Sequence, residues 1–248
     1  MSGHSKWATI KHKKAAADTK RGKLFTKVIK EITVAAKSGG GNPDTNPRLR
    51  TAIGTAKESN MPQDNIDRAI KKGTGELPGT VYEEVSYEGY GPQGVAIYVQ
   101  CLTDNKNRTA SEIRSIYDKK GGNMAGAGSV AWIFEKKGLF VVATSVISED
   151  KLMDIVLSAG AEDLTTEGEA YEVTCAAHDF EAVKKALADQ KVATSSAEIT
   201  MLPKNRIKVG ADNAKQVLNL IEALEDHEDV QNVYSNVDIP DEVMKDIA

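Results

Sequence analysis

The spacing of hydrophobic residues changes once along the chain. Up to about residue 75, apolar positions recur every three to four residues, which predicts helices. Over 20–37, seven apolar residues share one side of a helical wheel and five lysines the other. A glycine-rich run ends that helix, a second helix begins at Pro47, and a third begins at Pro62 and ends at Gly73. The pattern predicts a bundle of three short helices.

From residue 80 onward the hydrophobic period shortens to two, which is typical of strands. A hairpin of strands 81–90 and 94–103 is predicted, followed by a helix at 105–120, a glycine-rich loop and a strand at 129–137. Strand, helix, strand, strand, helix and strand then follow at 138–145, 148–160, 161–167, 170–176, 178–190 and 193–202. This βαββαβ order is the ferredoxin-like plan.

The last two predicted elements, a helix at 211–227 and a strand at 230–239, have no sheet of their own. We expect them to return and complete the ββαβ unit of residues 81–135. The predicted fold class is α+β multidomain, with an N-terminal three-helix bundle and two α/β domains, the second ferredoxin-like and inserted into the first. The predicted domains are 1–75, 80–135 plus 206–240, and the insertion 136–205.

The positive charge is concentrated at the start of the chain. Overall there are 32 Lys and Arg against 36 Asp and Glu. Residues 1–75 contain 16 basic and 6 acidic residues, a formal charge of +10, so the remainder, with 16 against 30, carries −14. Such asymmetry suggests that the basic part meets a polyanion while the acidic part keeps the molecule dissolved.

The opening segment places Trp7 among lysines and histidines, which offers a stacking face and charges that neutralise phosphates. The predicted nucleic-acid-binding residues are His4, Lys6, Trp7, Lys11, His12, Lys13, Lys14, Lys20, Arg21, Lys23, Lys27, Lys30, Arg48 and Arg50. Arg68, Lys71 and Lys72 extend the positive field. In an alternative interpretation, Trp7 docks the first residues onto the bundle and the lysines form a solvated face; for Trp7 alone the two interpretations are balanced.

A second candidate site is the glycine-rich loop GGNMAGAGS. Its small residues allow the backbone to approach another molecule closely, and RNA is one candidate. The candidate residues are Gly121, Gly122, Asn123, Met124, Gly126, Gly128 and Ser129. The simpler interpretation is a flexible crossover between a helix and a strand.

Motifs for catalysis and metal binding are absent from the sequence. The loop has Ala127 where a phosphate-binding P-loop needs its lysine, and no serine lies in a nucleophile elbow. His178 and His227 are predicted at helix ends without a metal-binding context, and Cys101 and Cys175 as reduced core residues. We therefore expect no enzyme, no cofactor and no metal site.

Targeting signals are not evident either. The first 23 residues lack the apolar core of a secretory signal, and the longest apolar stretch is shorter than the roughly 20 residues of a membrane helix. We expect a cytoplasmic protein that does not enter a membrane.

Several long motifs resemble the YebC/PmpR family, which includes the mitochondrial translational activator of cytochrome c oxidase. They are GHSKWATIKHKKAAADTKRGKLFTK, NPRLRTAI, NMPQDNIDRAIKKGTG, YEGYGPQGVAIYV and LTDNKNRTASEIRSIYDKKGGNMAGAGSVAWIF, all in the first half of the chain. The second half matches by element order only. The resemblance implies a three-domain protein without catalytic activity.

The same resemblance implies a partner but leaves its type open. Family members are described as cytoplasmic DNA-binding transcriptional regulators, whereas others resemble ribosome-associated factors that help translation of difficult sequences such as proline runs. We therefore expect DNA as the partner, or alternatively rRNA or tRNA on the ribosome. A protein partner of the acidic domains is a further candidate, and we expect a monomer.

Overall fold

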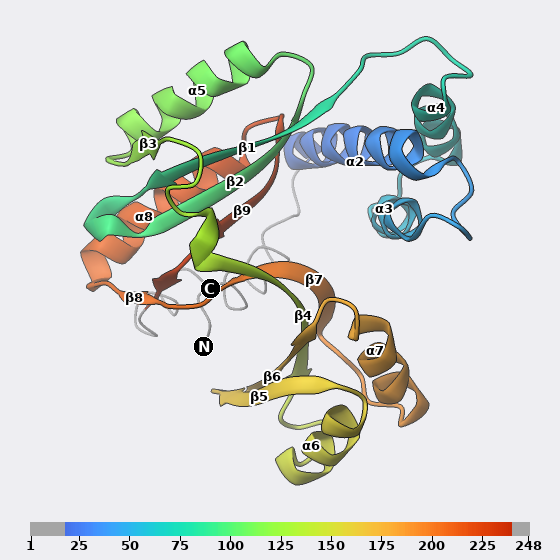
Figure 1. The fold of residues 1–248 in the computed structure, drawn as a ribbon, viewed down its shortest axis with the longest axis vertical. Coiled ribbons are helices and arrows are strands. Elements are labelled where there is room, and N and C mark those ends of the chain that lie inside the picture. The colour runs from blue at the N-terminus through green and yellow to red at the C-terminus, as the bar shows by residue number, and fades with distance from the viewer. Residues whose placement is uncertain (1–17, 240–248) are drawn as a thin grey trace.

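The computed structural model describes residues 18–239, and Figure 1 shows how its helices and two larger sheets are arranged. The helices are α2 (Asp18–Gly39), α3 (Pro47–Glu58), α4 (Gln63–Thr74), α5 (Lys106–Lys119), α6 (Glu149–Ser158), α7 (Phe180–Asp189) and α8 (Ala211–Glu225), with 3-10 turns η1 (Pro92–Gly94) and η2 (Ala131–Ile133). The strands are β1 (Glu83–Tyr90), β2 (Ala96–Thr103), β3 (Asn123–Ala125), β4 (Phe134–Ala143), β5 (Ala161–Glu167), β6 (Ala170–Ala176), β7 (Ser196–Pro203), β8 (Ile207–Lys208), β9 (Val230–Ser235) and β10 (Val237–Asp238). The predicted α+β class is confirmed, with helices first and two sheet-containing parts after them.

Helices α2, α3 and α4 pack around a small core that includes Ile32, Leu49 and Ile66. At the start of α3 the Asn46 side chain accepts a hydrogen bond from the Leu49 N–H, which is the capping that the Asn-Pro pair predicts. Gly73 was predicted to end α4, but α4 continues to Thr74. A side chain at Gly73 would meet the Thr33 carbonyl oxygen at 2.4 Å, so this glycine serves close packing against α2.

The first sheet has the strand order β3-β1-β2-β9, and α5 and α8 cover one of its faces. Tyr117 and Ile113 of α5 and Leu220 of α8 share one buried cluster with Ile97 of β2. Strands β2 and β9 pair directly although the whole second sheet separates them along the chain. Strand pairing alone does not define an independent folding unit, so the inserted domain and its boundaries stay a prediction.

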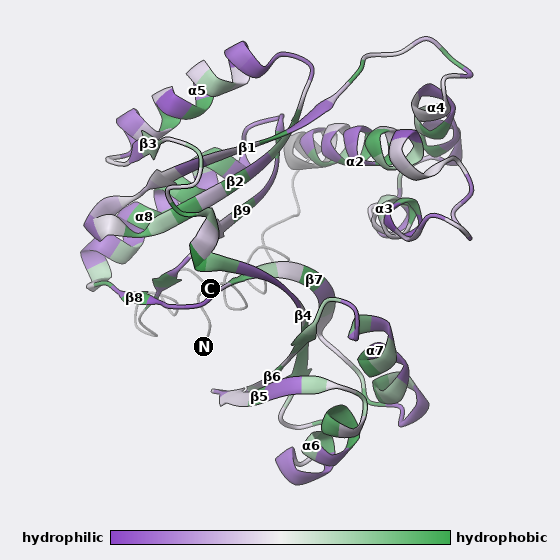
Figure 2. Ribbon diagram, viewed as in Figure 1, coloured by the Kyte–Doolittle hydropathy of each residue, from purple (hydrophilic) through white to green (hydrophobic). Residues whose placement is uncertain are grey.

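The second sheet has the strand order β5-β6-β4-β7, with antiparallel pairing throughout. Helices α6 and α7 pack on it through a core that includes Phe140, Leu152 and Val183. In chain order its elements run βαββαβ, as the ferredoxin-like plan requires. Figure 2 shows green and purple residues side by side on these helices, as expected of amphipathic helices that cover a sheet.

The prediction of a strand at 129–137 is wrong. Residues 131–133 form the turn η2, and β4 is one continuous strand from Phe134 to Ala143 in the second sheet. The strand that pairs with β1 is instead Asn123–Ala125, inside the segment predicted as a loop. Small residues and glycines concealed this three-residue strand, because they carry little β propensity.

Both cysteines are buried and unpaired by disulfide, as predicted. Over the described residues, 18–239, no helix is both long and apolar enough to cross a membrane.

Candidate nucleic-acid interface

The lysines of α2 do not all face solvent. Lys23 lies 3.8 Å from the Asp226 carboxylate, and Lys27 donates a hydrogen bond to the Glu225 carbonyl oxygen. Lys30, one turn further, donates to the Glu228 carbonyl oxygen at 3.1 Å. The spacing of four and three residues puts these lysines on one stripe of the helix. That stripe lies against the turn between α8 and β9.

Asp229 is the centre of this contact. Its carboxylate accepts hydrogen bonds from Lys30 on one oxygen, and on the other from Arg108 at 2.8 Å, Thr109 at 2.7 Å and Thr103 at 3.2 Å. The donors come from α2, α5 and β2, so one buried charge ties the helical bundle to the first sheet.

Burial works against the ionised form of Asp229, but the hydrogen bonds from Lys30, Arg108 and Thr109 outweigh it and hold its pKa well below the usual value. The side chain of Lys30 is 8% exposed, and its ammonium also lies 5.6 Å from the centre of the Tyr82 ring. Lys30 therefore has no free face for a phosphate. Its predicted role in nucleic-acid binding is corrected to a structural one, because its charge is used inside the protein.

The two predicted arginines of α3 differ from each other. Arg48 donates hydrogen bonds from two nitrogens to the Glu31 carboxylate of α2, at 2.6 and 3.1 Å, and it also forms an ion pair with Glu84 of β1. The hydrogen bond to Glu31 is the main cause of its raised pKa. Arg50 donates to the carbonyl oxygens of Pro43 and Asp44 and remains exposed. Arg48 is thus a bridge between elements, whereas Arg50 keeps its charge at the surface.

Other cations of the bundle are exposed and form no ion pair with any carboxylate in the described part of the chain. They are Lys37, Lys57, Arg68, Lys71 and Lys72. The last turn of α4 holds Lys71 and Lys72, where positive charge also suits the helix dipole. In Figure 1, α3 and α4 lie at the end of α2 away from the first sheet. This end of the bundle is the described surface best suited to a polyanion.

The remaining candidates lie outside what the structure describes. His4, Lys6, Trp7, Lys11, His12, Lys13 and Lys14 precede residue 18, and the side chains of Lys20 and Arg21 are not described either. Their roles stay a prediction.

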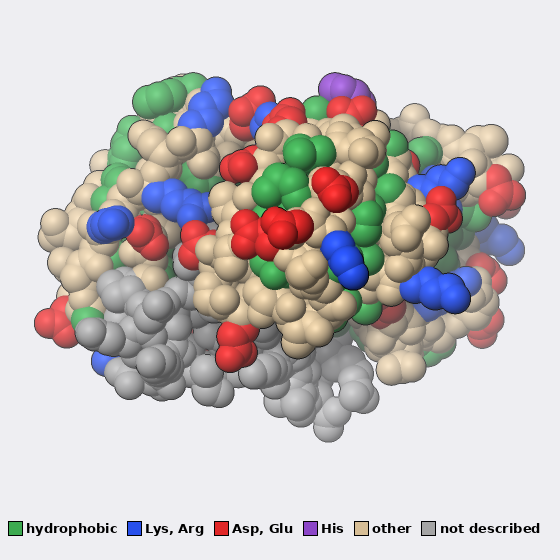
Figure 3. All heavy atoms as spheres, turned by 90° about the horizontal axis from the view of Figure 1, so that it is seen from below, with side chains coloured by type: hydrophobic (Ala, Val, Ile, Leu, Met, Phe, Trp, Pro, Cys, Tyr) green, Lys and Arg blue, Asp and Glu red, His purple; other side chains and the backbone are tan. Residues whose placement is uncertain are grey.

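The end of the molecule that carries α6 and β5, away from α3 and α4, is acidic. Figure 3, which views this end, shows carboxylates gathered around apolar side chains near its centre. Exposed acids there include Glu149, Asp150 and Asp154 of α6 and Glu162 and Asp163 of β5. A polyanion would be repelled from this surface.

The glycine-rich loop and the turn after it bind a carboxylate of the same chain, that of Glu88. Gly128 N–H, Val130 N–H and Ala131 N–H donate to the Glu88 carboxylate at 2.6 to 2.8 Å. Burial opposes ionisation of Glu88, which is 4% exposed, but these three bonds together lower its pKa. The donors that a phosphate would need at this point are therefore occupied, and whether RNA approaches the rest of the loop stays a prediction.

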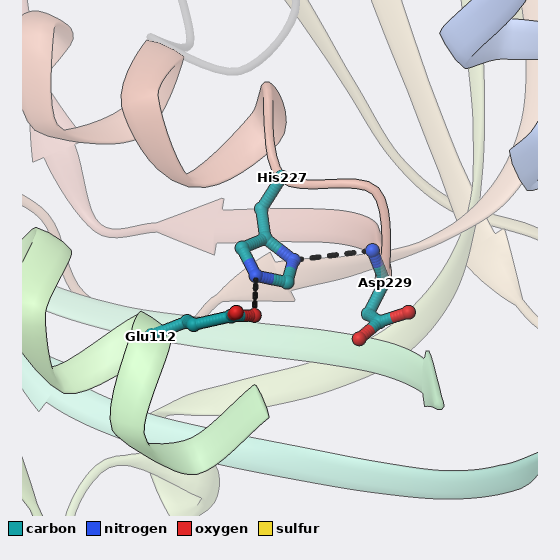
Figure 4. A group of neighbouring side chains, drawn as sticks. All are labelled: Glu112, His227 and Asp229. Atoms are coloured by element: carbon teal, nitrogen blue, oxygen red, sulfur yellow. Dashed lines mark hydrogen bonds and ion pairs between the residues drawn. The ribbon is translucent and has the colours of Figure 1, made fainter. Parts of the chain in front are cut away.

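A third cluster brings together Glu112, His227 and Asp229, with ligand atoms within 4.8 Å of one another. Figure 4 shows the His227 ring between the Glu112 carboxylate and the backbone N–H of Asp229. The Asp229 N–H donates to Nδ1 at 3.1 Å, so Nε2 carries the proton that is shared with Glu112 at 2.8 Å. Nδ1 is occupied, and the Asp229 oxygens are bound by Lys30 and Arg108. This arrangement does not fit a metal ion; it fixes the turn that receives α2.

One exposed aromatic residue escaped the sequence analysis. Trp132 is 65% exposed on η2, directly after the glycine-rich loop. The sequence predicts a strand at 129–137, whereas the 3-10 turn that forms there leaves this side chain exposed.

Comparison with known proteins assigns both parts of the chain to one group. Residues 5–76 match the model of the TACO1/YebC protein N-terminal domain, and residues 82–237 match the model of the TACO1/YebC second and third domain. The chain is 57% identical over 244 residues to a "Probable transcriptional regulatory protein" of Desulfatibacillum aliphaticivorans, covering 98% of this chain and 99% of that protein. It is 55% identical over 249 residues to a protein of the same name from Dictyoglomus turgidum, covering all of both chains. Among solved structures, a conserved hypothetical protein from Aquifex aeolicus, Aq1575, has a TM-score of 0.81 and 47% identity over 94% of this chain and 97% of that one.

Proposed function

The chain belongs to the TACO1/YebC family, and from this we propose that it is a non-enzymatic regulator of gene expression that binds nucleic acid through its N-terminal helices. The names of its relatives support a regulatory role in transcription. DNA is accordingly the first candidate target. The protein acts by binding, without a cofactor, in the cytoplasm.

The observation that carries the proposal is the uneven distribution of charge. The first 75 residues have a formal charge of +10, and four exposed cations of α3 and α4 have no carboxylate partner in the part of the chain described, namely Lys57, Arg68, Lys71 and Lys72. Unpaired cations gathered on one surface bind a phosphate backbone by releasing its counterions. The acidic end of the molecule would orient the protein on its target.

Fluorescence anisotropy with a labelled DNA duplex tests the DNA proposal, using the purified full-length chain at several salt concentrations. We expect log affinity to fall linearly with log salt, with a slope of about −0.9 for each phosphate contacted. Absence of binding to duplex DNA, single-stranded RNA and ribosomes alike would overturn the proposal.

A charge-matched pair of variants tests the contribution of the first residues. Replacing Lys11, Lys13 and Lys14 by Gln removes three of the predicted contacts. The control replaces three exposed lysines of the second part of the chain, Lys151, Lys185 and Lys191, by Gln. We expect only the first variant to lose affinity and salt dependence; equal losses would show that net charge alone matters.

Ribosomal or transfer RNA is the alternative target. It is favoured by the aromatic residues Trp7 and Trp132, because unpaired bases stack on aromatic rings whereas duplex DNA hides its base faces. Co-sedimentation with ribosomes, compared with duplex binding at the same salt concentration, distinguishes the two targets.

A further inference from the structure

We propose that Trp132 and the basic segment 204–208 form a second contact with nucleic acid, in which the indole stacks on an unpaired base and the cations hold the adjoining phosphates. The inference rests on the proposed function and names its ligand chemistry, single-stranded nucleotides. It also places this contact outside the basic N-terminal helices.

The indole of Trp132 is held in place by its polar edge. Its Nε1–H donates to the Ser129 carbonyl oxygen at 3.1 Å, and the Tyr90 hydroxyl donates to the same oxygen at 3.0 Å. The next two residues, Ile133 and Phe134, are buried in a cluster with Val130. The turn η2 is therefore anchored by these buried side chains, while 65% of Trp132 remains exposed.

This arrangement suits stacking. The only hydrogen-bond donor of the indole is already used within the protein, so what it offers to a partner is its apolar ring. Base stacking needs such a ring, held in a fixed orientation, and tolerates any base because each has a π face. Tyr90, 36% exposed, lies beside it as a second aromatic surface.

A basic segment begins beside the turn that carries this ring. The Lys204 N–H donates to the Ile133 carbonyl oxygen at 2.8 Å. The backbone of the segment after β7 therefore begins against the residue that follows Trp132. Lys204, Arg206 and Lys208 are exposed, form no ion pair with a described carboxylate, and have no acidic residue between them. They form a basic island in a part of the chain whose formal charge is otherwise negative.

Two carboxylates near Trp132 are engaged by other groups, while Asp238 of β10 lies opposite Lys208 in the strand register without an ion pair to a described residue. Glu88 lies beneath the loop and is bound by three backbone N–H groups. Glu135, on the strand that follows Trp132, lies 3.4 Å from the Lys137 ammonium. Gly126 and Gly128 of the loop leave open space where side chains would project.

Tryptophan fluorescence tests the contact directly, because the chain has only two tryptophans. In a Trp7→Phe variant, Trp132 is the sole reporter. We titrate this full-length variant with a single-stranded RNA of about 12 nucleotides, the corresponding single-stranded DNA, and the DNA duplex. Stacking predicts saturable quenching by the single strands and little by the duplex. Unchanged fluorescence with single strands that do bind would overturn the inference.

Affinity measurements on the otherwise wild-type chain complete the test. Trp132→Ala should weaken binding of the single strand at least ~5-fold, the loss expected for one base–aromatic stack, and Trp132→Phe should restore part of it. Lys204→Gln with Arg206→Gln should weaken it further at low salt. The control, Leu157→Ala, removes an apolar side chain of α6 that is 50% exposed, and it should have no effect.

The outcomes separate the inference from the proposed function. If the Lys11, Lys13 and Lys14 variant loses affinity but Trp132→Ala binds as the wild type does, the N-terminal interface stands and the second contact is wrong. If no nucleic acid binds the wild type at all, both are wrong. Discrimination between RNA and DNA single strands would identify which source of unpaired bases the surface prefers.

Discussion

Helix α2 and the pair α3 and α4 are similarly rich in cations, but they use them differently. The stripe of Lys23, Lys27 and Lys30 on α2 ends on the turn between α8 and β9, where Asp229 is buried. Lys71 and Lys72 of α4 are exposed and have no partner among the described carboxylates. The first set holds the protein together, and the second is available to a ligand.

The difference shows that a count of charges does not locate a binding surface. A buried lysine with a carboxylate within hydrogen-bond distance contributes to folding, because its charge is neutralised inside the protein. Only a cation that remains solvated and unpaired can exchange its counterions for a phosphate. Stability and nucleic-acid affinity should therefore respond to different substitutions.

The largest effect is expected from Asp229→Asn. It removes the charge that Lys30 and Arg108 share and leaves the Lys30 ammonium buried without a counter-ion. We expect a loss of about 3 kcal/mol or more in the free energy of unfolding, measured by urea denaturation. The control, Asp226→Asn, breaks an exposed pair with Lys23 at 3.8 Å and should change it by less than about 1 kcal/mol. Similar effects of both substitutions would contradict the comparison.

Glu88→Gln should have the next largest effect. It removes a charge that accepts three backbone hydrogen bonds from the loop before β4. We expect a loss of about 2 kcal/mol in the free energy of unfolding, since hydrogen bonds to a charged group contribute about 1.5 to 3 kcal/mol. Glu84→Gln on the same strand is the control: it weakens only an exposed ion pair with Arg48 and should change the free energy of unfolding by less than about 1 kcal/mol. Urea denaturation of both variants measures the difference, and no loss in Glu88→Gln would show that the loop does not depend on this anion.

Acid should destabilise the protein through the same two carboxylates. The pKa values of Glu88 and Asp229 are both lowered in the folded state. The two ionised carboxylates contribute fully to the free energy of unfolding above their unfolded-state pKa, about 4. This contribution is lost as the pH falls towards their folded-state pKa values. The free energy of unfolding of the wild type should therefore fall below about pH 4. The curve of Asp229→Asn should be flatter there, and a curve parallel to the wild type would contradict this assignment.

Arg48→Lys should have the smallest effect. Lysine cannot reproduce the two-nitrogen contact with Glu31, but the side chain of Arg48 is 40% exposed and the pair is screened by solvent. We expect a loss of at most about 1 kcal/mol in the free energy of unfolding and no change in nucleic-acid affinity. A loss of affinity would show that Arg48 contacts the ligand despite its internal partners.

The sequence predicted most of the helices and strands, because their hydrophobic periods are regular and their ends carry asparagine, proline and glycine. It failed at residues 121–137, where a three-residue strand of small residues and a 3-10 turn follow no period. The total charge of the N-terminal part was evident from the sequence. Its division into structural and available cations was not, since Lys30 and Asp229 meet only in the fold and are 199 positions apart.

The central claim is that the unpaired cations of α4 contact nucleic acid. The most direct measurement is the slope of log affinity against log salt for the wild type and for a variant with Arg68, Lys71 and Lys72 all replaced by Gln, on one DNA duplex. If all three residues contact phosphates, the slope should become shallower by about 2 to 3, while the free energy of unfolding stays nearly unchanged. An unchanged slope would contradict the account.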